Sequence, residues 1–221
     1  METESKPLVT EPGFNGKHSP ALRIWHWGTF FTIFGSLTTV LFAKTLLNAK
    51  DNTSLVQENL QKSNIPVSSD QARSVAHEFS DLVWHWHIYI GYVLAALLGF
   101  RILFEFFQPK EQKIIPMLKN SLKYLRMPGA DKEKTKHFLI VRCLYIFFYF
   151  ALFVQACTGL FMAYSDDVES LKDLRHTAKS IHNIFMWVII SYIVIHIGGV
   201  ILAELGKKHK GVVSRMINGG E

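Results

Sequence analysis

The chain has 221 residues, of which 49% are hydrophobic and 19% are charged, and its mean hydropathy is positive. Because the charges lie between long apolar stretches, the composition indicates an integral membrane protein rather than a soluble domain, and the spread of the net charge of +6 argues against a nucleic-acid partner. The two cysteines form no CxxC or CxxCH motif, which excludes covalently attached c-type haem.

Four apolar stretches are long enough to cross the hydrocarbon core of a bilayer, which requires about 20 residues. The first begins near Pro20, a favoured residue in the first turn of a helix. We expect membrane spans at residues 20–47, 82–104, 138–164 and 180–204. The chain is therefore predicted to be all-α. It would consist of an N-terminal segment (1–19), a four-helix membrane bundle (20–206) and a basic tail (207–221).

The connection between the first two spans, residues 48–81, also has a helical pattern. Ser69 and Asp70 are suitable helix caps, and apolar residues follow them at helical spacing as far as Trp86. We expect this outer loop to be partly helical and to continue without a break into the second span. A similar extension is expected before the fourth span, from about Leu171.

The connections differ in charge balance. Lys and Arg number three against five acidic residues in 48–81 and three against four in 165–179, but eight against four in 105–137, and the tail after Glu204 is basic. Because positively charged loops stay on the cytoplasmic side, both termini and the 105–137 loop are predicted to be cytoplasmic.

Six histidines lie within or at the ends of the predicted spans, where a ring is costly and usually faces a partner, a cofactor or the bundle interior. They are His26, His85, His87, His137, His182 and His196. His182 and His196 are fourteen residues apart, so they share one helix face about 21 Å apart. Antiparallel helices bring His26 level with His196, and His87 level with His182. Each pair would place two neutral imidazoles on opposite faces of one haem iron.

His85 competes with His87 for the outer tier, because two residues along a helix are about 200° apart and both cannot face inward. We favour His87, which is followed at helical spacing by Gly91 and Ala95, small residues that admit a flat macrocycle. His85 is assigned to the outer membrane interface.

Further polar residues lie toward the predicted cytoplasmic side. Arg23, Arg101 and Arg142 either extend to the lipid headgroups or contact haem propionates, which need cationic partners. His137 is either an ordinary residue at a helix end or, with Arg142, part of a quinone or proton site.

Several motifs together resemble one superfamily of di-haem membrane cytochromes: "RIWHW" in the first span, "HIYIGYVLAALLGFR" in the second and H-x13-H in the fourth. The superfamily contains the prokaryotic cytochrome b561 proteins, the b-type cytochrome subunits of nickel–iron hydrogenases and the gamma subunit of respiratory formate dehydrogenase. "TGL" at 158–160 and "SRMINGG" at 214–220 are weaker similarities. The resemblance implies two b-haems, held by His26 with His196 and by His87 with His182, in the bacterial inner membrane. The outer segment 48–81 is longer than in many members.

The resemblance implies electron transfer between a periplasmic redox subunit, such as a hydrogenase, and a quinone. The quinone would be menaquinone or ubiquinone and would bind near the inner haem. An alternative is a self-sufficient superoxide:quinone oxidoreductase, with Lys172, Arg175 and Lys179 attracting the anion. A third hypothesis is a haem-free scaffold with structural histidines. Four intramembrane histidines that pair by depth argue against it, because unpartnered histidines are costly in a membrane.

Overall fold

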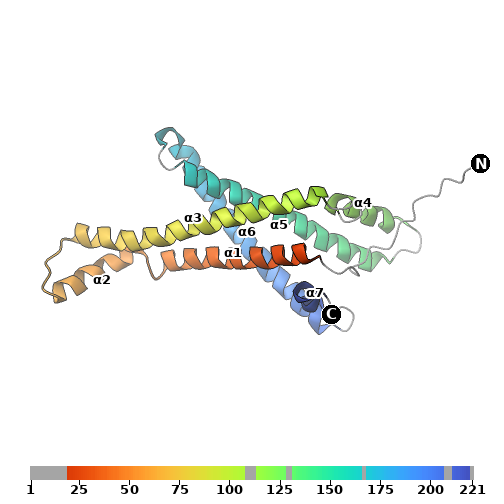
Figure 1. Ribbon diagram of the computed structural model, residues 1–221, viewed down its shortest axis with the longest axis horizontal. Coiled ribbons are helices and arrows are strands. Elements are labelled where there is room, and N and C mark those ends of the chain that lie inside the picture. Colours follow the sequence, from red (N-terminus) through yellow and green to blue (C-terminus); the bar gives the residue numbers. More distant parts are fainter. Residues whose placement is uncertain (1–18, 108–112, 128–130, 166–167, 207–210, 220–221) are drawn as a thin grey trace, which may run out of the picture. The chain divides into compact units, whose positions relative to one another are not determined.

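The structure is a computed structural model that describes residues 19–107, 113–127, 131–165, 168–206 and 211–219. The predicted segment 1–19 lies almost wholly outside these residues, as does the start of the predicted tail, 207–210. All regular secondary structure in the described residues is helical, as predicted. The helices (Figure 1) are α1 (Pro20–Lys44), α2 (Ala49–Lys62), α3 (Ser69–Phe107), α4 (Ile114–Leu125), α5 (Lys132–Tyr164), the short 3-10 helix η2 (Glu169–Leu171), α6 (Lys172–Leu205) and α7 (Val212–Ile217).

Three of these helices are long and apolar enough to cross a membrane: α3, α5, and α6 together with η2. α1 reaches this standard only when it is joined to α2, to which it is bent by 55°. The reason is compositional, because α1 carries six hydroxyl or imidazole side chains among its apolar residues, at positions 26, 29, 32, 36, 38 and 39. The described residues therefore contain three spans, or four if the bent pair counts as one.

Helix starts follow local capping chemistry. The Ser19 hydroxyl accepts a hydrogen bond from the Leu22 backbone N–H (3.3 Å) just before Pro20. α3 begins with a capping box one residue earlier than the cap predicted at Ser69: the Ser68 N–H donates to Gln71 Oε1 (2.9 Å), and the Gln71 N–H donates to Ser68 Oγ (3.2 Å). From there α3 runs unbroken to Phe107.

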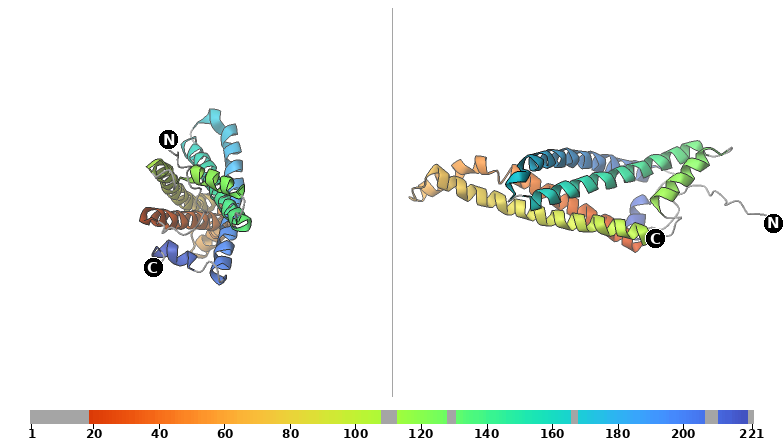
Figure 2. Two further views of the ribbon diagram at one scale, coloured as in Figure 1. Left: turned by 90° about the vertical axis from the view of Figure 1, so that its right-hand side faces the viewer. Right: turned by 90° about the horizontal axis from the view of Figure 1, so that it is seen from above.

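The chain divides into two compact units, which are described separately. Unit 2 comprises Ile24–Leu97 and Ala156–His182. In it, α1 lies alongside α3 (Figures 1 and 2), and the Trp25 Nε1–H donates to the Leu97 carbonyl oxygen (2.9 Å). α2 lies beside the first turns of α3, where the small side chains of Ala72 and Ala76 are buried.

Unit 1 comprises Met1–Arg23, Leu98–Gln155 and Asn183–Glu221. Its core includes Phe138, Ala151 and Leu152 of α5. α4 packs along the first part of α5 (Figure 2). The start of α7 is tied to the end of α6, because the Glu204 carboxylate accepts hydrogen bonds from the backbone N–H groups of residues 211 (3.0 Å) and 213 (2.7 Å).

Candidate haem site

Two of the predicted histidines meet within unit 2. The rings of His87, on α3, and His182, on α6, have centroids 6.3 Å apart, with their planes 79° apart. Both side chains are partly exposed. The structure thus brings together the two residues that the sequence predicts for the outer tier, although they are far apart along the chain.

The spacing of these rings can be compared with that of a bis-histidine metal site. Imidazole nitrogen lies about 2.0–2.1 Å from a transition metal such as zinc, so two rings on opposite sides of one metal have centroids roughly 6.4 Å apart. The observed 6.3 Å agrees with this value. A separation of this size would allow one iron to be held between the two rings.

A chain of hydrogen bonds determines which nitrogen of His87 can bind a metal. The Thr39 hydroxyl lies 2.6 Å from the Ser36 carbonyl oxygen, to which it donates its single hydrogen. Its oxygen must then accept from His87 Nδ1, which lies 3.0 Å away. His87 consequently carries its hydrogen on Nδ1, and the lone pair that a metal needs is on Nε2. Ser36 Oγ is a second neighbour of the same Nδ1, at 3.4 Å.

His182 has a similar environment. Its Nδ1 lies 3.0 Å from Thr158 Oγ1. The next residue, Gly159, makes room for the ring, because a Cβ atom built there would lie 3.2 Å from His182 Cε1. That distance is tighter than ordinary carbon contacts, so a side chain at position 159 would displace the imidazole.

His85 differs from His87 in every one of these respects. Its side chain is exposed, and its Nδ1 bonds to the Asp81 carbonyl oxygen one turn earlier in the same helix (2.9 Å). One turn after His87, by contrast, a Cβ atom built on Gly91 meets no atom of the described residues within 4 Å. The ring spacing, the Nδ1 partners and the small residues together fit a haem held by His87 and His182.

Comparison with known proteins agrees with this chemistry. The model of one family, prokaryotic cytochrome b561, matches residues 17–219. The chain belongs to the prokaryotic cytochrome b561 family. No curated protein and no solved structure matches it significantly.

Membership confirms the family resemblance of the sequence motifs. The protein is a b-type cytochrome of the electron-transfer class, binds haem, and is a multi-pass bacterial membrane protein. The match extends from residue 17 to residue 219, so it includes all of unit 2 and most of unit 1.

The two histidines predicted for the inner tier of this cytochrome belong to different units, so their pairing stays a prediction. In unit 2, His26 makes an edge contact with Trp27, with ring centroids 5.4 Å apart. In unit 1, His196 stacks on Tyr192 one turn earlier, with centroids 5.9 Å apart and planes within 5°. Tyr192 in turn stacks on Phe148 of α5 at 4.4 Å.

The three predicted propionate contacts of the cytochrome lie in unit 1 and have protein partners there. Arg23 Nη1 donates to the Ile217 carbonyl oxygen (3.0 Å). Arg101 donates from Nη1 to Glu105 Oε2 (2.9 Å) and from Nε to the Tyr149 hydroxyl (3.2 Å). A role toward propionates stays a prediction for these residues.

Arg142 and His137 are not brought together. Arg142 is 8% exposed, donates from Nη1 to Ser121 Oγ (3.1 Å), and holds its guanidinium 3.8 Å from the centre of the Phe138 ring. His137 is exposed. Five residues along a helix turn through about 140°, which explains why the two side chains of α5 diverge.

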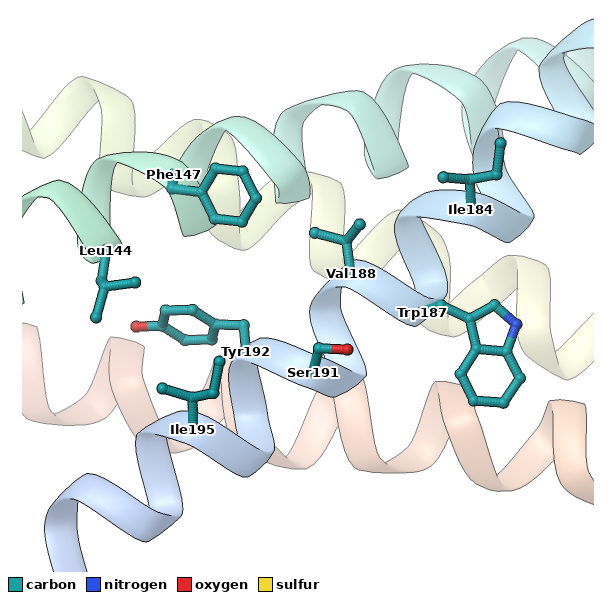
Figure 3. Close-up of a pocket in the computed structure, with 8 residues that line it drawn as sticks. All are labelled: Leu144, Phe147, Ile184, Trp187, Val188, Ser191, Tyr192 and Ile195. Carbon is teal, nitrogen blue, oxygen red and sulfur yellow. The ribbon is translucent and has the colours of Figure 1, made fainter.

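Unit 1 of the cytochrome also contains an open, apolar groove of about 560 Å³ between α5 and α6 (Figure 3). Tyr192 and Ser191 supply its hydroxyl groups, and neither His137 nor Arg142 lines it. Its size falls within the range of small-molecule sites, about 300–1,000 Å³.

Sequence reasoning missed the residues that orient the rings of the cytochrome. Thr158 and Gly159 belong to "TGL", which is only a weak similarity in the sequence. Thr158 bonds to His182, and Gly159 leaves room for its ring. Thr39 and Ser36 gave no signal beyond two hydroxyls on an apolar span. Hydroxyls in membrane helices commonly bond to a preceding carbonyl, so their presence alone does not indicate a site.

Proposed function

We propose that this cytochrome passes electrons between a redox protein on the outer side of the membrane and the quinone pool, using two b-haems. The observation that carries the proposal is the His87–His182 pair, whose centroids are 6.3 Å apart. Those two residues would hold the outer haem, and His26 and His196 the inner one. A bound b-type haem accepts and returns one electron at its iron.

The chain's own residues set the conditions for that chemistry. The helices around His87 and His182 supply an apolar surrounding, and the hydroxyls of Thr39 and Thr158 hold each imidazole by Nδ1. In unit 1, Arg23 and Arg142 supply positive charge, which would stabilise propionates or an anionic quinone, and Arg101, paired with Glu105, would contribute less net charge.

Unit 1 has two candidate binding sites for the quinone, which would be either menaquinone or ubiquinone. The first comprises His137 and Arg142 of α5, where the Arg142 guanidinium supplies a cationic group although the two side chains diverge. The second is the groove beside Tyr192, whose apolar lining suits an isoprenoid chain and whose volume is about 560 Å³. The variants H137A/R142A and S191A/Y192F distinguish them, because only the variant at the true site slows reoxidation of the reduced protein by a soluble quinone analogue.

The self-sufficient superoxide:quinone activity has less support. Of the three residues that would attract superoxide, Lys172 is paired with Glu169 at 2.6 Å, which offsets its charge. Reduction of the purified chain by superoxide, with quinone as acceptor and no partner present, would favour this activity over the subunit function.

The decisive experiment is purification from native membranes, with haem quantified per chain and co-eluting proteins identified. We expect two b-haems per chain, reoxidation by a quinone analogue, and a co-eluting redox protein. A chain that stays colourless when haem supply is ample would overturn the proposal.

A further inference from the structure

α4 has an outward face of unusual composition. It combines large apolar and basic side chains at spacings of four, three and four residues, which place them on one stripe of the helix. This outward stripe consists of Ile115, Lys119, Leu122 and Arg126, with Lys123 beside it. All five side chains are exposed; Ile115 is 64% exposed and Leu122 is 48% exposed.

The first turn of α4 is held against the end of a membrane-spanning helix in the same unit. The Glu105 carboxylate accepts a hydrogen bond from the Ile114 N–H (2.7 Å) and pairs with Arg101 (2.9 Å). Lys113 Nζ donates to the Phe106 carbonyl oxygen (3.2 Å). α4 therefore starts at the level where α3 ends.

The middle of α4 is held against α5. Ser121 is fully buried and accepts a hydrogen bond from Arg142 (3.1 Å). These contacts fix the rotation of α4 about its axis. The outward stripe is consequently a preformed surface, directed away from the helices of unit 1.

We propose that this outward stripe binds the anionic phospholipid headgroups of the membrane in which the protein lies. Lys119, Lys123 and Arg126 have no ion-pair partner in the part of the chain that the structure describes. Lipid phosphates supply the complementary charge, and the acyl region beneath them accepts Ile115 and Leu122. A nucleic acid or a soluble acidic protein would match the charges but leave these two apolar side chains without a partner.

The experiment compares the wild type with K119Q/K123Q/R126Q, purified in detergent, on titration with phosphatidylglycerol or phosphatidylcholine. The readouts are the thermal unfolding midpoint and the lipids retained in native mass spectrometry. The matched control, K62Q/K172Q/K179Q, removes the same charge from exposed lysines of unit 2. A charge-conserving variant, K119R/K123R/R126K, tests whether the site needs charge rather than these particular side chains.

We expect phosphatidylglycerol to stabilise the wild type, the control and the charge-conserving variant, and its apparent affinity to fall roughly tenfold or more in K119Q/K123Q/R126Q. If the triple variant does not fold, each single glutamine variant should show part of the same loss. Equal losses in the control, or equal stabilisation by phosphatidylcholine, would overturn the proposal. Neither readout depends on electron transfer, so the result is independent of the proposed function.

Discussion

The rings of His87 and His182 in unit 2 and of His196 in unit 1 make different kinds of contact. In unit 2, the Nδ1 atoms of His87 and His182 each lie 3.0 Å from a threonine hydroxyl. In unit 1, His196 stacks on Tyr192, which stacks on Phe148. A hydrogen bond to a ring nitrogen sets both the rotation of the ring and its tautomer, whereas stacking sets only the plane of the ring. The outer pair is therefore pre-oriented by the hydrogen bonds to its ring nitrogens.

The units also differ in charge. The groups around the outer pair are neutral hydroxyls, while unit 1 contains two arginines that are less than a tenth exposed, Arg101 and Arg142. Buried guanidinium groups are costly unless hydrogen bonds or anions compensate them. This contrast suits a ligand-orienting region in unit 2 and an anion-stabilising region in unit 1, and the following variants test it.

The largest effect is expected from H87A, which removes one of the two rings of the outer pair. We expect the haem content to fall from two per chain to one, measured from the absorption of the pyridine haemochrome. H85A is the matched control and should retain both haems, because its ring bonds within its own helix. Loss of haem in H85A and not in H87A would show that His85, and not His87, is the haem ligand.

The next largest effect is expected from G159V. Since even a Cβ atom would lie 3.2 Å from His182 Cε1, a branched side chain must displace the ring, at a cost of about 1–3 kcal/mol. Outer-haem occupancy should decrease when haem supply is limiting. G99V is a suitable control, because no described atom lies within 4 Å of a Cβ built on Gly99. Equal occupancy in the two variants would contradict a tight fit at His182.

E105Q tests the charge network of unit 1. Removing the carboxylate weakens the pair with Arg101 and the interaction with the start of α4, so we expect the free energy of unfolding to fall by about 1–2 kcal/mol. Thermal denaturation measures the change. E58Q breaks the exposed pair with Lys62 and should cost less than about 0.5 kcal/mol. Similar losses in both variants would mean that burial does not strengthen the Arg101–Glu105 pair.

The smallest effect is expected from T39V, which removes the acceptor of the His87 Nδ1–H. That hydrogen bond makes the imidazole a stronger electron donor, so its loss should raise the midpoint potential of the outer haem. A hydrogen bond worth about 1 kcal/mol corresponds to roughly 40 mV for one electron. Potentiometric titration measures the shift. The control T39S keeps the hydroxyl and should have the midpoint potential of the wild type. An unchanged potential in T39V would show that Thr39 does not orient the ring.

The sequence by itself was sufficient for the long helices and for the family, but it did not predict α4 or α7. Long apolar stretches indicated an all-helical membrane protein, Pro20 indicated the start of α1, and the spacing after Ser69 indicated one helix through the second span. These properties depend on residues close together in the chain, so hydropathy and periodicity report them directly.

Only the tertiary structure decided which side chains surround the histidines. Thr39 and His87 are 48 residues apart, and Thr158 and His182 are 24 apart. Their contacts depend on the rotation and axial register of packed helices, which no local pattern encodes. For the same reason, the sequence could not show that Ser121 of α4 meets Arg142, or that Glu105 binds the first turn of α4. Composition determined that the helices form, whereas their packing determined what each polar group bonds to.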